Sequence, residues 1–155
     1  MNGSEALTFA GYWNQPSTDD WARVLATFPL FSGISKRRLR KLVRDAKFAE
    51  FAPGDTVFAT EDTADSLYVI LSGTAKVRGK VAARTLRTGD YFGELGVLDS
   101  APRSATVVAT HELHVMRLPR QSFLRLAQND PAISLTMLRN LGVQFRRLET
   151  QAAQP

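Results

Sequence analysis

Between residues 48 and 118 the chain carries seven short runs rich in valine, leucine, phenylalanine, tyrosine and threonine, separated by turn residues. The runs cover residues 48–51, 56–60, 66–71, 74–78, 82–87, 105–110 and 112–118. Seven short strands within about seventy residues are typical of an antiparallel sandwich or barrel. The sequence Arg78-Gly79-Lys80 is a tight hairpin signal between two of these runs. This pattern indicates an all-β core at the centre of the chain.

Helical periodicity flanks the β pattern on both sides. A helix is predicted from Thr18 until Pro29 stops it, and a second follows the capping residue Ser35. After Pro119 we expect a helix that ends at residues 129–131 and a last helix that continues through residue 148. The predicted fold is mainly β, a β-roll or jelly-roll barrel, with helices at both ends. We expect an N-terminal extension with a short helix at 1–27, one domain at 28–150 and a tail at 151–155.

Composition narrows the class of protein. The chain has 155 residues, 44% hydrophobic and 23% charged, which fits a globular protein with one domain. The sequence shows no membrane-spanning run and no secretory signal, and it has no cysteine for disulfides, zinc-thiolate sites or a nucleophile. We expect a cytoplasmic protein, and the arginine-rich, alanine-rich composition hints at a bacterium. A net charge of +5 fits an anionic partner.

One segment interrupts the barrel pattern and carries candidate chemistry. Residues 93–98 can form one or two helical turns, whose first unpaired N–H groups favour a phosphate. Gly93 has no Cβ, so a ligand can approach its backbone closely. Arg103 can return past a turn to bond the same phosphate, whereas Glu94 suits a hydroxyl such as a ribose 2′-OH. Ser104 adds a hydroxyl donor, so the set predicts a sugar phosphate inside a small barrel.

Two stretches make up this segment: Phe92-Gly93-Glu94-Leu95-Gly96-Val97-Leu98 and Pro102-Arg103-Ser104-Ala105-Thr106-Val107. Together they resemble the phosphate-binding cassette of the cyclic nucleotide-binding domain family. That family includes catabolite activator proteins, protein kinase A regulatory subunits and cyclic nucleotide-gated channels. Further similarities occur in order at residues 28–31, 53–55, 65–73 and 89–90. The resemblance extends over residues 28 to 148.

The resemblance implies a role for each matching position. The backbone of residues 93–95 and the Arg103 side chain would hold a cyclic phosphate, and Glu94 would bind the ribose 2′-OH. Val77 and Leu86 would pack on a purine, and Gln144 on the last helix, with Arg146 or Arg147 as alternatives, would cover it. The predicted ligand-binding residues are Val77, Leu86, Phe92, Gly93, Glu94, Leu95, Arg103, Ser104, Ala105 and Gln144.

One position departs from the family pattern. Glu61 stands where family members commonly have a glycine, directly before the acidic residue matched by Asp62. We expect this difference to affect the geometry of one turn remote from the pocket.

The implied function is a sensor module for a purine cyclic mononucleotide, cAMP or possibly cGMP, with no cofactor and no enzyme activity. Movement of the last helix would relay occupancy to an effector protein or to a second copy of the chain. The alternatives are an interaction scaffold with a degenerate pocket, or the sensor fragment of a larger transcription factor, kinase or channel. A transcription factor would need a helix-turn-helix after the last helix, so direct DNA binding is not expected from a sequence ending at Pro155.

Other candidate sites have plainer interpretations. His111 and His114 are three residues apart in a predicted strand and should face opposite sides, so no shared metal is expected. No histidine lies near Ser104 in the sequence, so a hydrolase triad has no base. The basic helix at 36–47 lacks interleaved aromatic residues and is interpreted as a solvated face rather than a nucleic-acid or membrane surface.

Overall fold

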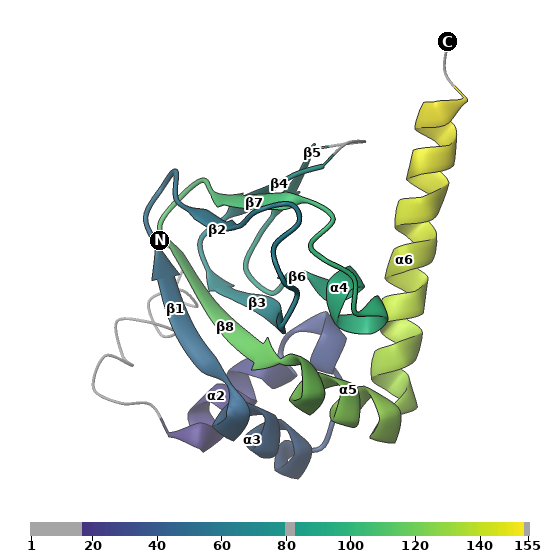
Figure 1. Ribbon diagram of the computed structural model, residues 1–155. Coiled ribbons are helices and arrows are strands. Elements are labelled where there is room, and N and C mark those ends of the chain that lie inside the picture. The colour runs from purple at the N-terminus through teal and green to yellow at the C-terminus, as the bar shows by residue number, and fades with distance from the viewer. Residues whose placement is uncertain (1–16, 80–82, 154–155) are drawn as a thin grey trace.

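A computed structural model describes residues 17–79 and 83–153 of the chain. Eight strands form two four-stranded antiparallel sheets that face each other, with helices below and beside them (Figure 1). The strand order is β1-β8-β3-β6 in one sheet and β2-β7-β4-β5 in the other. This arrangement confirms the predicted jelly-roll with flanking helices. The strands are β1 Lys47–Phe51, β2 Thr56–Phe58, β3 Ser66–Ser72, β4 Ala75–Arg78, β5 Ala83–Leu86, β6 Tyr91–Phe92, β7 Thr106–Ala109 and β8 Leu113–Pro119.

The predicted strands are all present, with ends that differ by one or two residues, and β6 is an addition to them. β6 has only two residues and pairs with β3, so it carries too little alternation to be recognised in the sequence. β4 and β5 form the predicted antiparallel hairpin, with Arg78 opposite Ala83. Arg78, predicted to begin the turn, therefore lies in β4 instead, and Lys80 of the predicted turn lies outside the described residues.

β3 explains how two cores arise from one central strand. Its side chains alternate, as a strand of period two requires. Leu67, Val69 and Leu71 pack in one cluster with the helices, whereas Tyr68 and Ile70 pack between the two sheets. Because β3 is covered on both faces, its sequence is almost continuously apolar instead of alternating with polar residues.

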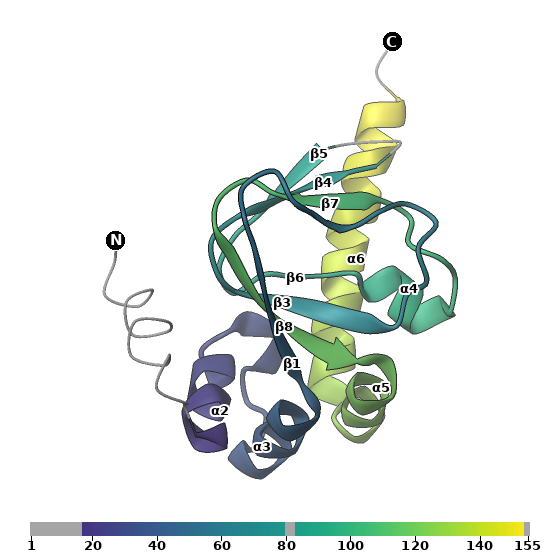
Figure 2. The same cartoon turned by 60° about the vertical axis from the view of Figure 1, so that its left-hand side comes forward.

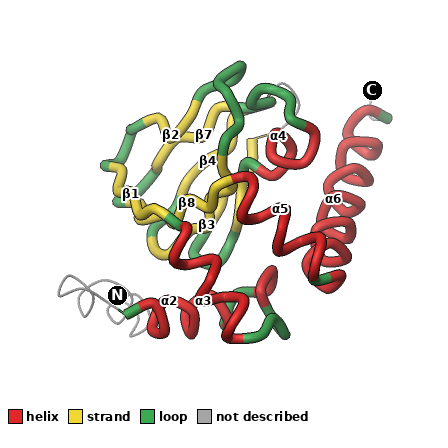
Figure 3. The backbone as a smooth tube through the Cα atoms, turned by 60° about the horizontal axis from the view of Figure 1, so that its bottom comes forward, coloured by secondary structure: helices red, strands yellow, loops and turns green. Residues whose placement is uncertain are grey.

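The helices are α2 Thr18–Ala26, the 3-10 turn η2 Pro29–Phe31, α3 Lys36–Asp45, α4 Glu94–Asp99, α5 Arg120–Asn129 and α6 Pro131–Ala152. α2, α3 and α5 lie together beneath the sheet that contains β1, β8 and β3 (Figures 2 and 3). Ser17 begins α2 with a capping box to Asp20, which satisfies two backbone donors. Trp21 and Leu25 of α2 are buried in the same cluster as Leu39 of α3, so α2 packs as part of the folded body.

α6 rises beside the barrel and passes α4, as Figure 1 shows. Pro131 stands at its first turn, where the missing N–H costs nothing. The helix continues to Ala152, so its last turn includes Gln151, which the sequence pattern assigned to the tail. Among the helices of the described ranges, none is both long enough and apolar enough to cross a bilayer.

Candidate functional site

A cavity of about 520 Å³ lies between the β4–β5 hairpin, α4 with the segment that follows it, and the face of α6 beside them. Nine of the ten predicted ligand-binding residues line it: Val77, Phe92, Gly93, Glu94, Leu95, Arg103, Ser104, Ala105 and Gln144. Residues far apart in the sequence therefore converge on one volume, as the sequence analysis expected for a binding site.

Leu86 is the exception among the predicted residues. It does not line this cavity, because it pairs with Ala75 deeper in the sheet and is buried in the core between the two sheets. Arg84, two residues earlier on the same strand face, occupies the lining position opposite Val77. The expectation that Leu86 lies against a bound base therefore finds no support in the lining of the cavity.

Gly93 begins α4 in a left-handed backbone conformation with φ of 84°. An added Cβ would lie 2.5 Å from Nη1 of Arg103 and 3.4 Å from Cε2 of Phe58. Glycine is required at this position for two reasons. The Arg103 guanidinium occupies the space that a Cβ would need, and L-residues other than glycine are strained at positive φ. The glycine thus accommodates the arginine as well as leaving room for a ligand.

Arg103 is held in a fixed place although it is charged and only 3% exposed. Its Nη1 donates to the Gly93 carbonyl at 2.9 Å, and its Nη2 donates to the Ser66 carbonyl at 2.7 Å. Nη2 also lies 3.9 Å from a carboxylate oxygen of Asp65. The guanidinium stacks over the Phe58 ring, with Cζ 4.2 Å from the ring centroid.

These contacts leave donors of Arg103 unused. A guanidinium has five N–H donors, and two hydrogen bonds to carbonyls are formed within the described chain. Its Nε is buried and has no partner among the described residues. Burial lowers the pKa of Arg103 below its usual value, but an arginine keeps its charge in proteins. A buried, charged donor that lines a cavity is suited to an anion.

Glu94 faces the same cavity and is 5% exposed. Its burial raises the pKa of the carboxyl above the ordinary value of 4.5, because the charged form loses hydration. A hydrogen bond from its own backbone and the positive charges of Arg84 and Arg103 oppose this shift. A buried carboxylate beside two arginines is suited to accept a hydrogen bond from a hydroxyl group.

Arg84 is the main lining residue that the sequence analysis missed. Strand alternation places it in phase with Leu86, whose side chain points into the barrel. The sequence does carry a signal for Arg84. Burying a charged side chain at an inward-facing strand position costs free energy unless the charge has a partner, so such a residue indicates a binding role. The other lining residues not predicted from the sequence are Phe58, Gly79, Ala83, Gly96, Val107, Leu148 and Gln151.

One face of α6 closes the cavity. Gln144, Arg147, Leu148 and Gln151 line it, with the spacing of one helical face. Of the two alternatives to Gln144, Arg147 lines the cavity, whereas Arg146 lines only a separate shallow hollow on α6. Gln144 and Arg147 are therefore the candidates on α6 that the cavity places beside a ligand, and the choice between them stays a prediction.

The turn at Glu61 is not remote from the site, contrary to expectation. The Glu61 N–H donates to the Arg103 carbonyl at 2.9 Å, and the Arg103 N–H donates to the Asp62 carbonyl at 2.8 Å. Glu61 adopts φ of 77°, the left-handed conformation that favours glycine. The turn keeps its shape without glycine because the Asp62 carboxylate accepts from the Ala59 N–H and fixes the loop.

Two contacts join the cassette to the C-terminal helices. Arg120, the first residue of α5, donates from Nε to the Val97 carbonyl of α4 at 2.8 Å and also bonds the Ser100 hydroxyl. Asn140 of α6 donates to the Tyr91 hydroxyl at 2.7 Å, next to the cassette. These hydrogen bonds connect α4 to α5, and Tyr91 beside the cassette to α6.

The two histidines lie apart from this cavity. His111 contacts the Thr74 hydroxyl at 2.6 Å, and buried His114 lies beside the carboxylates of Glu50 and Glu112. No group of three or more potential metal ligands occurs within residues 17–79 and 83–153. The chemistry of the described chain is instead concentrated in the cationic cavity around Arg103.

The model of the cyclic nucleotide-binding domain matches residues 48–130. The cAMP-dependent protein kinase regulatory subunit of Hypocrea atroviridis is 34% identical over 66% of this chain and 22% of that protein. A CRP-like cAMP-activated global transcriptional regulator of Mycobacterium tuberculosis is 29% identical over 84% of this chain and 61% of that protein. The regulatory domain of Toxoplasma gondii PKA, solved with cAMP, has a TM-score of 0.72 at 22% identity, over 81% of this chain and 50% of that chain. The match thus spans less than two thirds of each of these proteins.

Proposed function

Because this chain belongs to the cyclic nucleotide-binding domain family, we propose that it is a sensor module that binds a purine cyclic mononucleotide, with cAMP as the first candidate ligand. The observation that carries this proposal is the convergence of buried Arg103 and buried Glu94 on one cavity of about 520 Å³. Small-molecule sites are typically cavities of roughly 300–1,000 Å³ with a few well-placed polar groups.

The cyclic phosphate would lie against Arg103. Its unpartnered Nε supplies a charge-assisted donor, and the contacts to Gly93 and Ser66 fix the guanidinium in advance. The backbone of residues 93–95, with Ser104 and Ala105, would complete the surroundings of the phosphate. Preorganisation matters here because an arginine that is already ordered loses little side-chain entropy on binding.

The nucleoside would occupy the remainder of the cavity. Glu94 would accept a hydrogen bond from the ribose 2′-OH, and the purine would pack between Val77 and the α6 face that holds Gln144 and Leu148. Cations at Arg84, Arg103 and Arg147 outnumber the single carboxylate of Glu94 among the lining residues described. That balance supports a singly charged phosphate ester as the ligand.

The sensor step would be a shift between two arrangements of α6, since a ligand that binds one arrangement better increases its population. The Arg120–Val97 and Asn140–Tyr91 contacts support this path, because they join the cassette to α5 and α6. The moved helix would then alter a contact with an effector protein or with a second copy of the chain. These partners, and a soluble cytoplasmic setting, form part of the proposal.

Calorimetric titration of the chain with cAMP, cGMP and 5′-AMP tests the proposal. Both cyclic nucleotides are included because Ser104 is suited either to phosphate or to a guanine amino group. A ligand at about 100 times its Kd that binds only the folded state adds about 2.7 kcal/mol of stability, so the Tm must rise as well. Heat and a Tm shift with a cyclic nucleotide, exceeding those with 5′-AMP, are expected. Absence of both would favour an interaction scaffold with a degenerate pocket.

A further inference from the structure

A second concave site lies between α3 and α5 and shares no lining residue with the nucleotide cavity. Both helices lie beneath the barrel (Figure 2). Its volume is about 690 Å³. We call it the α3–α5 groove, and five cationic side chains line it: Arg37, Arg38, Lys41, Arg44 and Arg125. The nucleotide site does not use any of these residues.

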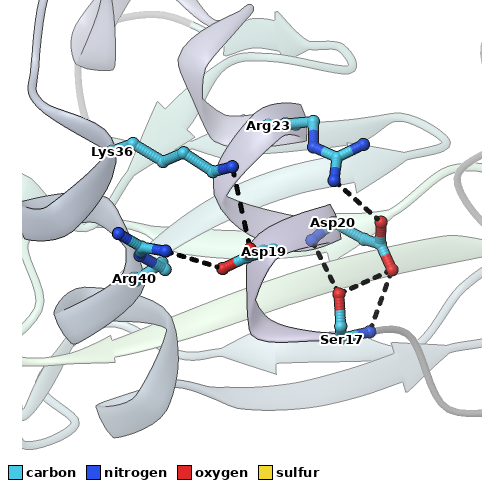
Figure 4. A network of polar contacts seen from close by, with 6 residues as sticks. All are labelled: Ser17, Asp19, Asp20, Arg23, Lys36 and Arg40. Carbon is cyan, nitrogen blue, oxygen red and sulfur yellow. Dashed lines mark hydrogen bonds and ion pairs between the residues drawn. The ribbon is translucent and has the colours of Figure 1, made fainter.

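The cations of α3 fall into two sets, three with an acidic partner and three without one in the described chain. Lys36 and Arg40 turn toward α2, where Asp19 lies 3.7 Å and 3.3 Å from them (Figure 4). Arg38 is paired with Asp130 at 2.9 Å. The remaining groove cations, Arg37, Lys41, Arg44 and Arg125, are exposed and have no ion pair within the described chain.

The groove cations are arranged against local electrostatic preference. The first turn of α3 is Lys36, Arg37 and Arg38 with no acidic residue, although the positive end of the helix dipole favours acidic residues there. Arg37 and Lys41 are four residues apart, and like charges at this spacing destabilise a helix. Residues that violate a local rule without internal compensation mark functional sites more often than packing sites.

A hydrogen bond connects the two helices that form the groove. Ser122 of α5 donates to the Asp45 carboxylate of α3 at 3.0 Å. This bond also occupies the only carboxylate that lines the groove among the described residues. The four unpaired cations thus lie on both walls of the groove, and the one lining carboxylate, Asp45, already accepts a hydrogen bond from Ser122.

We propose that the α3–α5 groove binds an acidic segment of a partner protein. Charge complementarity carries the choice of ligand, because four unpaired cations from two helices face one concave volume. No aromatic side chain lines the described groove to stack on the bases of a single strand. Its large apolar residues, Leu42 and Leu126, are buried, so it offers nothing to insert into a membrane surface.

The test measures fluorescence anisotropy with a labelled peptide of alternating glutamate and serine. A groove variant carries Arg37→Gln, Lys41→Gln, Arg44→Gln and Arg125→Gln. A matched control carries Lys76→Gln, Arg78→Gln, Arg87→Gln and Arg139→Gln, which remove the same charge at positions outside both sites. We expect the groove variant to bind about tenfold more weakly or worse, since several pairs are lost together, and the control to change by less than about twofold.

Two further readouts separate binding from structure. Removing like charges from α3 should leave the Tm unchanged or raise it, whereas a purely structural role would lower it. The cAMP affinity of the groove variant should equal that of the wild type, so this proposal can fail while the nucleotide site stands. Equal loss of peptide binding in both variants would overturn it. Groove-dependent binding of duplex DNA or of phosphatidylglycerol vesicles, without peptide binding, would also overturn it.

Discussion

Nη1 of Arg103 lies 2.9 Å from the carbonyl oxygen of Gly93, in the space that a Cβ at Gly93 would need. The arginine and the glycine therefore depend on each other. The arginine orders the start of α4, and the glycine allows the guanidinium to reach the backbone while keeping a positive φ.

Gly93→Ala should destabilise the fold and weaken nucleotide binding together. The left-handed backbone costs a non-glycine residue about 1–2 kcal/mol, and the displaced guanidinium adds to that cost. Urea unfolding measures the stability, and titration with cAMP measures the binding. Gly142→Ala is the matched control, because it lies in α6 with open space around its Cβ and should gain about 0.5–1 kcal/mol. A Gly93→Ala protein with wild-type stability would contradict the role of this contact.

Glu94→Gln should change the pH dependence of stability. Burial raises the pKa of Glu94 in the folded state above 4.5, so the folded protein holds this proton more tightly than the unfolded chain does. The wild type therefore loses stability relative to the glutamine variant as the pH rises above 4.5 and through the raised value. Below 4.5 this difference should no longer depend on pH.

Urea titrations of both proteins between about pH 4 and pH 8 give this difference directly. The expected curve for the variant minus the wild type rises with pH and then levels off. A curve that stays flat over the whole range would show that the carboxyl keeps an ordinary pKa in the folded protein. A falling curve would show that its pKa is lowered instead.

Glu61→Gly should stabilise the protein by about 0.5–1 kcal/mol, because it relieves a left-handed residue at some cost in unfolded-state entropy. The loop also forms paired backbone hydrogen bonds with Arg103, so cAMP affinity should stay equal or improve. Chemical unfolding and calorimetry check the two parts. Glu50→Gly, in strand β1, is the control and should destabilise. A loss of stability in Glu61→Gly would mean that the glutamate side chain supports the turn.

Tyr91→Phe and Asn140→Ala should show coupling in a double-mutant cycle of unfolding free energies. The 2.7 Å hydrogen bond from Asn140 to the Tyr91 hydroxyl should contribute about 0.5–1.5 kcal/mol. Hydrogen exchange in α6 should become faster in either single variant, since the bond ties this helix to the cassette. If the two substitutions have additive effects on the unfolding free energy and leave hydrogen exchange in α6 unchanged, this hydrogen bond is not part of the proposed relay.

The β core and the cassette could be predicted from the sequence because both depend on local patterns. The run 66–71 is almost continuously apolar, the run 112–118 mixes apolar residues with polar ones, and both appear, as β3 and β8. β6, by contrast, has two residues, and its place is set by pairing with Tyr68 and Val69 of β3. A pairing between distant segments leaves no periodic trace in so short a run.

The residues around the cavity also divide into those that local sequence predicts and those that depend on contacts between distant segments. Gly93, Glu94 and Arg103 lie within one short segment, so their chemistry can be recognised together. Strand alternation marks Arg84 as inward-facing, but its place opposite Val77 on the cavity depends on the register of β5 on β4, which a single sequence does not reveal. Glu61 appeared remote because its contact with Arg103 joins residues 42 positions apart through backbone atoms. Side-chain type carries no information about such a bond.

The most direct test of the account is the cAMP affinity of Arg103→Ala against that of the wild type, measured by calorimetry. Loss of a charge-assisted bond from a buried arginine is worth roughly 2–3 kcal/mol, so binding should weaken by about 100-fold. Arg103→Lys keeps the charge without the planar fork and guards against a folding defect, and exposed Arg78→Ala is the control with no expected change. Wild-type affinity in both folded Arg103 variants would contradict the claim that this guanidinium holds the cyclic phosphate.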